Sequence, residues 1–124
     1  MRPDAAPVVD QMYAMSRWLI AHTAKFPRSH KFVLGDRIVC RALDVLETLT
    51  RAAYSREKDV LLDRANADLQ GLRILVRLSF EERLTSTSQY AYASVQLTEI
   101  GAQIGGWIKQ SGTSPNEKRQ RPDR

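Results

Sequence analysis

The chain has 124 residues, a formal net charge of +5 and 43% hydrophobic residues. This length accommodates one domain with one core, and it leaves no room for a separate catalytic domain. No apolar run approaches the roughly 18 residues that a membrane span requires, so we expect no membrane association. Cys40 is the single cysteine, which excludes an internal disulfide and favours a reducing, cytoplasmic location.

Apolar residues recur three and four positions apart from the start of the chain, which is the period of an amphipathic helix. A first helix is predicted after Pro7, and Pro27 ends it. Its apolar stripe is Val8, Met12, Met15 and Leu19, followed by His22.

A second helix follows Pro27, with Ser29 as its expected N-cap. Its predicted stripe is Phe32, Gly35, Val39, Ala42, Leu46, Leu49 and Ala53. We expect a turn at residues 54–56, where Ser55 is the plausible cap of the next helix.

Two more helices complete the pattern. The third stripe is Leu62, Ala65, Leu69, Leu72, Val76 and Ser79, and the fourth is Tyr90, Ala93, Leu97, Ile100, Ile104 and Trp107. Residues 85–88 supply several Ser and Thr caps for the fourth helix. Gly112 and Pro115 end it, so we predict a helical domain over 1–110 and a disordered basic tail over 111–124.

Short connections make neighbouring helices antiparallel, so the predicted fold is an all-α, up-down-up-down four-helix bundle. Further apolar residues lie off the stripes, namely Trp18, Ile20, Leu34, Ile38, Leu43, Val45, Leu61, Ile74, Leu75 and Leu78. This surplus favours a second buried face and hence a homo-oligomer. Broad core faces within a monomer are the alternative.

The sequence carries no recognisable catalytic motif. No Glu has a His three residues later, which removes the usual carboxylate-bridged metal site of bundles, and nucleotide-binding and nucleophile-elbow motifs are missing too. Cys40 is expected to be a buried structural thiol, and His22 a hydrogen-bonded core histidine. The spacing of Gly101, Gly105 and Gly106 indicates close helix packing near Trp107. We therefore predict no catalytic residue, no metal site and no cofactor.

Positive charge is concentrated in residues 25–41, where five cations face Asp36 alone, and in the tail. Such clustering favours a polyanionic partner. Arg28 and Lys31 lie near the predicted start of helix two, while Arg37 and Arg41 share one of its faces. Arg73 and Arg77 share a face of helix three, one turn after Gln70. The alternative is that these arginines pair at the surface with Asp36, Asp44, Glu81 or Glu82. Phe26 and Phe32 flank the basic loop and could stack on bases, although burial is commoner for Phe.

Three segments resemble the accessory variability determinant proteins of diversity-generating retroelements, within a four-helix-bundle group that includes ribosomal-RNA intervening-sequence proteins. The segments are FPRSHKFVLGDRI (26–38), LRILVRL (72–78) and IGAQIGGWIK (100–109), and the resemblance covers about residues 8–110.

The resemblance implies a homopentameric, barrel-like ring that binds a reverse transcriptase and template-repeat RNA, supports mutagenic cDNA synthesis and has no catalytic residues. By position in the motifs, it implies nucleic-acid binding by Arg28, Lys31, Arg37 and Arg41, and partner binding by Arg73 and Arg77. Two alternatives stay open: an intervening-sequence-type bundle without a polymerase partner, and an adaptor that binds only protein.

Overall fold

The computed structural model describes residues 6–111, and every regular element in that range is helical. The elements are α1 (Ala6–Thr23), α2 (Arg28–His30), the π-helical segment η1 (Lys31–Gly35), α3 (Asp36–Tyr54), α4 (Lys58–Glu81) and α5 (Thr87–Gln110). Because α2, η1 and α3 follow one another without a break, they form one long second helix. Residues 6–111 thus hold four long helices and no strand, as predicted.

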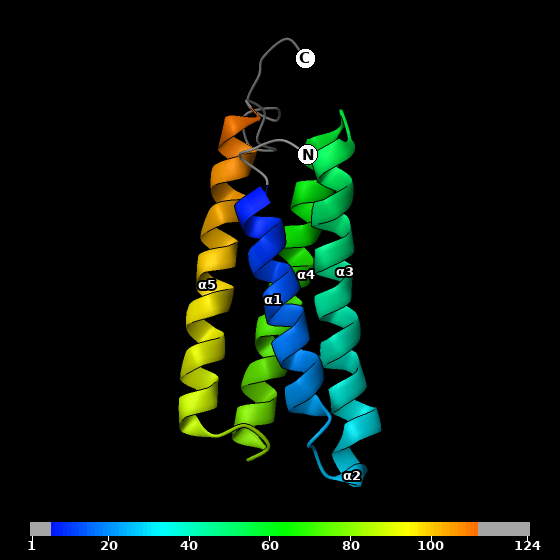
Figure 1. Ribbon diagram of the computed structural model, residues 1–124, viewed down its shortest axis with the longest axis vertical. Coiled ribbons are helices and arrows are strands. Elements are labelled where there is room, and N and C mark those ends of the chain that lie inside the picture. The colour runs from blue at the N-terminus through cyan, green and yellow to red at the C-terminus, as the bar shows by residue number, and fades with distance from the viewer. Residues whose placement is uncertain (1–5, 112–124) are drawn as a thin grey trace.

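Successive helices run in opposite directions along one axis, so the up-down-up-down bundle is confirmed (Figure 1). α1 packs mainly against α3 and α5, and α4 packs mainly against the same two helices. α1 and α4 therefore occupy opposite corners of a square. α2, η1 and the α4–α5 turn lie together at one end, which we call the α2 end. No helix among the described residues is long and apolar enough to cross a membrane.

The predicted stripes of three helices form the core. All members of the stripe on α4 are buried, as are all those on α5 except the half-buried Tyr90. On α1, Val8, Met12, Met15 and Leu19 are buried, each at most 2% exposed. Each of these helices faces inward with the 3.6-residue period that its sequence shows.

The predicted stripe of the second helix is partly wrong. Phe32 is 63% exposed, and Val39 and Leu46 are only half-buried, whereas Leu34, Ile38 and Val45 are buried. The cause is η1, because a π-helical turn takes more residues than an α-helical turn. It rotates Phe32 outward and shifts the inward face of α3 from Val39 to Ile38.

The apolar surplus is divided between the core and the surface. Leu34, Ile38 and Val45 contribute to the bundle's own core, which agrees with the alternative of broad core faces. Ile74 and Leu78 on α4 stay exposed, at 62% and 43%. Part of the surplus is therefore still available for contact with another molecule.

The predicted close packing along the glycines of α5 holds at one position. A Cβ on Gly101 would lie 3.4 Å from Leu69 Cδ2, whereas a Cβ on Gly105 or Gly106 would meet no atom within 4 Å. The close approach is therefore made by Gly101 against α4, and the other two glycines face open space within the described chain.

The helix ends differ in how they are capped. Ser86 caps α5 through a capping box, in which Gln89 N–H donates to Ser86 Oγ (3.2 Å) and Ser86 N–H donates to Gln89 Oε1 (2.8 Å). The prediction for Ser29 is wrong, because Pro27 occupies the N-cap and Ser29 Oγ instead lies 2.9 Å from His30 Nδ1. The prediction that Ser55 caps the next helix is wrong as well, because Glu57 is the N-cap of α4 and Ser55 is the C-cap of α3. The Ser55 hydroxyl accepts from the Glu57 N–H at 3.0 Å.

The α4–α5 turn places a non-glycine residue in the left-handed region. Arg83 has φ 64°, and Leu84 N–H and Arg83 N–H donate to the carbonyls of Ser79 and Phe80 at 2.8 and 3.0 Å. This is the Schellman pattern, in which the left-handed position usually holds glycine. The turn orders Thr85, which is buried directly before the start of α5.

His22 joins α1 to this turn through a buried hydrogen-bond chain. His22 Nε2 lies 2.8 Å from Thr85 Oγ1, Thr85 Oγ1 lies 2.8 Å from Ser79 Oγ, and Ser79 Oγ donates to the Val76 carbonyl at 2.6 Å. Since Ser79 has one hydroxyl proton, Thr85 must donate to Ser79, and His22 Nε2–H must donate to Thr85. The ring also stacks on Trp18, with centroids 4.8 Å apart. The predicted hydrogen bond of His22 is confirmed, but the side chain is half-buried at the edge of the core and not inside it.

The predicted tail over 111–124, with Gly112 and Pro115, falls outside the described residues from position 112 onward, as does the start of the predicted domain at residues 1–5.

We predict that the bundle loses stability as the pH falls through about 6.5. Burial, and next the positive charge of Lys25, lower the pKa of His22 below its ordinary value of 6.5. On acidification the unfolded chain therefore takes up the proton first, and the loss ends once the pH passes below the folded-state pKa.

The measurement is the free energy of unfolding in urea from pH 7.5 to pH 5.5 for the wild type and His22→Gln. The advantage of the wild type should shrink as the pH falls in this window. His30→Gln removes the chain's other histidine as the control, and a slope that disappears with His30 instead of His22 would contradict the prediction.

Candidate nucleic-acid and partner interfaces

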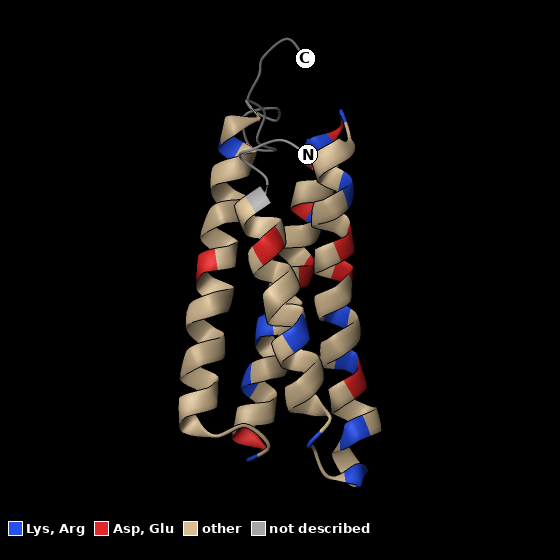
Figure 2. Cartoon of the chain, in the orientation of Figure 1, with Lys and Arg blue, Asp and Glu red and all other residues tan. Residues whose placement is uncertain are grey.

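Cations gather at the α2 end, where Pro27 starts the second helix (Figure 2). Arg28 and Arg37 are exposed, and Lys31 is half-buried. Within residues 6–111 none of these three side chains takes part in an ion pair, although Asp36 is close by in sequence. The alternative of surface ion pairing is therefore not realised here, and the three charges are free to bind an anion.

Arg41 lies in a different environment from the other three predicted nucleic-acid residues. Its Nε is 4.0 Å from Asp44 Oδ2, and its guanidinium lies over Gly71 of α4, so close that a Cβ at residue 71 would clash with Nη1. It lines a polar groove between α3 and α4. The other groove residues are Asp44, Glu47, Thr48, Arg51, Arg64 and Asp68. The groove contains both acidic and basic side chains, so acids near Arg41 offset its charge. Arg41 therefore differs from the three unpaired cations of the α2 end.

The two phenylalanines that flank the basic loop have opposite environments. Phe26 is buried, 5% exposed, and its ring meets the His22 ring edge-on at a centroid distance of 5.4 Å. Phe32 lies in η1 and is 63% exposed. Of these two rings, that of Phe32 is therefore the one available for a ligand.

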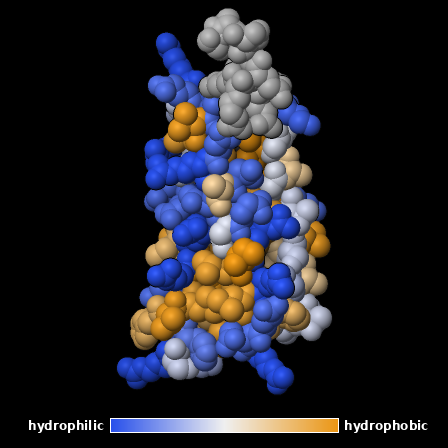
Figure 3. Space-filling model, turned by 180° about the vertical axis from the view of Figure 1, so that it is seen from behind, coloured by the Kyte–Doolittle hydropathy of each residue, from blue (hydrophilic) through white to orange (hydrophobic). Residues whose placement is uncertain are grey.

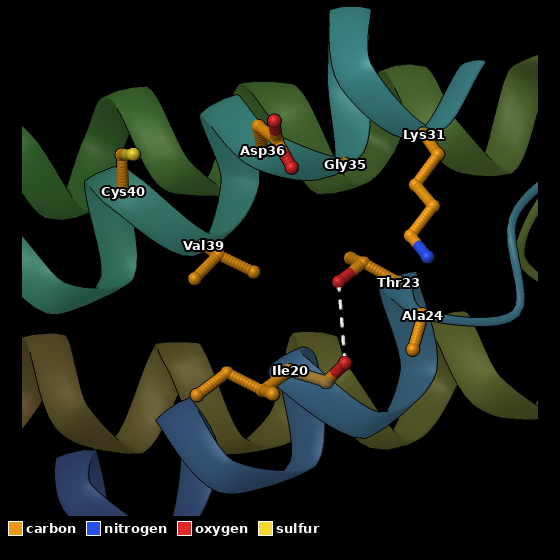
Figure 4. A pocket seen from close by; sticks show the side chains of 8 residues that line it. All are labelled: Ile20, Thr23, Ala24, Lys31, Gly35, Asp36, Val39 and Cys40. Carbon is orange, nitrogen blue, oxygen red and sulfur yellow. Dashed lines mark hydrogen bonds between the residues drawn. The ribbon is translucent and has the colours of Figure 1, made fainter. Parts of the chain in front are cut away.

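A hollow of about 330 Å³ lies between the end of α1 and the start of the second helix (Figure 4). Its lining is Ile20, Thr23, Ala24, Lys31, Gly35, Asp36, Val39 and Cys40. Ile20 and Val39 face each other across it, and Lys31 extends from η1 toward Thr23. This orientation explains why Lys31 is half-buried while Arg28 and Arg37 are exposed.

The prediction that Cys40 is a buried thiol is wrong. Its side chain is exposed and lies at the rim of this hollow. The inward face of the second helix is centred on Ile38, Ala42 and Val45, so residue 40 points away from the core.

Arg73 and Arg77 line a second depression, of about 400 Å³, on the groove between α4 and α5. Gln70, Ile74 and Tyr90 complete it. Arg73 Nη2 donates to Thr98 Oγ1 of α5 at 3.3 Å, and Arg77 Nε donates to Glu81 Oε2 at 3.1 Å. The pairing with Glu81 agrees with the surface alternative, but both partners are more than half exposed and such a pair contributes little stability.

The depression combines guanidinium groups with apolar walls. Tyr90 stacks on Phe80 at a centroid distance of 4.5 Å, which fixes one wall, and exposed Ile74 lies between the two arginines in sequence. An opening with two guanidinium groups and an apolar floor suits a protein segment that carries a carboxylate beside an apolar side chain. The structure thus brings Arg73 and Arg77 together, on a different face from the α2-end cations.

Comparison with known proteins identifies the family of the chain. A family model described as bAvd-like matches residues 8–111. No curated protein sequence matches the chain. Since the matched range covers nearly all of the described bundle, the chain belongs to the bAvd-like family, the accessory-variability-determinant type that its three motifs resemble.

Proposed function

We propose that the chain is a non-enzymatic, cytoplasmic accessory scaffold of a diversity-generating retroelement, which binds the reverse transcriptase and template RNA. The observation that carries the proposal is the family match over residues 8–111. In this role the protein supports mutagenic cDNA synthesis by holding polymerase and template together, and the polymerase supplies the chemistry.

RNA binding is assigned to the α2 end. Arg28, Lys31 and Arg37 have no ion pair among the described residues, and residues 25–41 contain one acid against five cations. Binding of phosphates there would release counterions, which is the main source of affinity for a polyanion. Arg41 contributes at longer range, since Asp44 offsets its charge.

Polymerase binding is assigned to the depression around Arg73 and Arg77. Its guanidinium groups and Ile74 provide charge and apolar contact at one place, which is the composition of an interface hot spot. This surface lies on the α4–α5 groove, so RNA and polymerase would not compete for the same side chains.

Self-association into a pentameric ring is the third part of the proposal. Apolar side chains gather on the lower half of the face opposite to that of Figure 1, over α4 (Figure 3). Leu78, which is 43% exposed, is the exposed large apolar residue of that half of α4 that lies outside the depression around Arg73 and Arg77. Contact with neighbouring copies would remove this surface from water.

The RNA assignment predicts a localised loss of binding. Arg28→Ala, Lys31→Ala and Arg37→Ala together should weaken binding of a structured RNA and reduce the slope of log K against log salt by about 2, because three phosphate contacts are lost. Arg51→Ala, Arg56→Ala and Arg64→Ala remove the same charge at the opposite end and should leave the slope nearly unchanged. Equal losses in both triple variants would show that binding depends on overall charge only.

The polymerase assignment predicts that Arg73→Ala with Arg77→Ala reduces co-purification of the retroelement's reverse transcriptase at least tenfold. Both side chains are on the surface of α4, so the helical circular dichroism spectrum should not change. Arg51→Ala with Arg64→Ala is the charge-matched control and should co-purify like the wild type. Unchanged recovery with the double variant would place the polymerase contact elsewhere.

The ring assignment predicts a mass near five chains by light scattering. Leu78→Glu should lower the mass toward one chain, because a carboxylate would be buried without a partner at the contact. Val60→Glu changes an exposed apolar residue on the same helix, 66% exposed, and is expected to keep the full mass. A wild-type chain that is monomeric at micromolar concentration would contradict the ring.

A further inference from the structure

The exposed ring of Phe32 is the feature of the α2 end that charge alone does not explain. A phenylalanine that is 63% exposed leaves most of its apolar surface in water, and its neighbour Val33 is 71% exposed. Most phenylalanines in proteins are buried, and Phe26, six residues earlier in this chain, is buried as well. An aromatic ring held outward beside unpaired cations is the composition of a site that stacks on nucleobases.

The backbone holds this ring outward. η1 begins at Lys31 and ends at Gly35, and its wider turn brings Leu34 and Gly35 into the core while Phe32 points to solvent. π-helical turns are rare in proteins and are frequent at functional sites. Because Leu34 and Gly35 are packed in the core, the backbone of the segment holds the Phe32 ring on its solvent side.

Cations lie on both sides of the ring along the helix. Arg28 precedes Phe32 by four residues and Arg37 follows it by five, so each lies about one helical turn from Phe32 along the chain. Both arginines are exposed and have no ion pair within residues 6–111. Their positions suit the phosphates that flank a base stacked on Phe32.

We propose that Phe32 stacks on an unpaired base of RNA, and that the α2 end therefore binds single-stranded RNA in preference to duplex. In a duplex the faces of the bases are covered by their neighbours, so the ring could stack only on a strand that is open. This inference rests on the proposed RNA-binding function and specifies the class of RNA that the site takes.

Tyr54 provides a matched comparison at the opposite end of the bundle. It is 72% exposed and lies between Arg51 and Arg56, but the two acids of residues 51–59 offset two of the three cations there, whereas residues 25–41 have one acid against five cations. An exposed aromatic ring is therefore present at both ends, whereas the uncompensated cations surround Phe32.

The test measures affinity of the full chain for three probes: a single-stranded RNA of twelve nucleotides without self-complementarity, the same strand in a duplex, and an abasic strand of equal length. The wild type should bind the single strand most tightly. Phe32→Leu keeps an apolar side chain but removes the ring, and it should weaken single-strand binding about tenfold, to the level of the abasic strand, with no change for the abasic strand itself. Phe32→Tyr should restore binding, and Tyr54→Leu should have no effect.

Two results would overturn the stacking inference while the proposed function stands: equal affinity of the wild type for all three probes with strong salt dependence, or unchanged affinity in Phe32→Leu. Unchanged RNA affinity together with loss of polymerase co-purification in Phe32→Leu would overturn it as well, because the ring would then contact protein. Absence of binding to every probe at low salt would reject RNA binding and the inference together.

Discussion

Burial of apolar side chains from α1, α3, α4 and α5 in one continuous core is the interaction on which the rest of the bundle depends. Each of these helices contributes a side chain that is 0% exposed, namely Met12, Leu49, Leu69 and Ile100. The polar side chains that enter it are small hydroxyls, and Ser16 and Ser79 donate to the carbonyls of their own helices. The core is thus a close-packed set of apolar side chains, and the charged groups that could bind a partner lie on the surface.

The surface divides into regions with different charge balance. At the α2 end the cations Arg28 and Arg37 are uncompensated, and the π-helical turn exposes Phe32 beside them. On the α4–α5 groove Arg73 and Arg77 adjoin apolar walls. The proposed scaffold role requires two such separate sites, one for the polymerase and one for its template, and the bundle carries both regions. Because the two regions use different surface side chains, substitutions in one region should leave the other region and the fold intact.

Most of the fold could be predicted from the sequence, because the stripes of α1, α4 and α5 follow the helical period without interruption. The second helix was harder, since no residue type marks a π-helical turn, and a regular period placed Phe32 in the core. The burial of Cys40 was mispredicted for the same reason, because the inward face after the π-helical turn is centred on Ile38, Ala42 and Val45, which leaves residue 40 outside it. The motifs identified the basic positions, but the sequence does not show which of them form ion pairs, because that depends on distances between side chains. Arg41 pairs with Asp44, whereas Arg37 has no ion pair within residues 6–111.

The most direct test of the account is to map where RNA lies on the full chain. Ultraviolet cross-linking of a single-stranded RNA that carries 5-iodouridine, followed by mass spectrometry of the peptides, identifies the side chains that contact bases. The account predicts cross-links within residues 25–41, with Phe32 among them. Cross-links confined to residues 51–64, at the opposite end of the bundle, would contradict it.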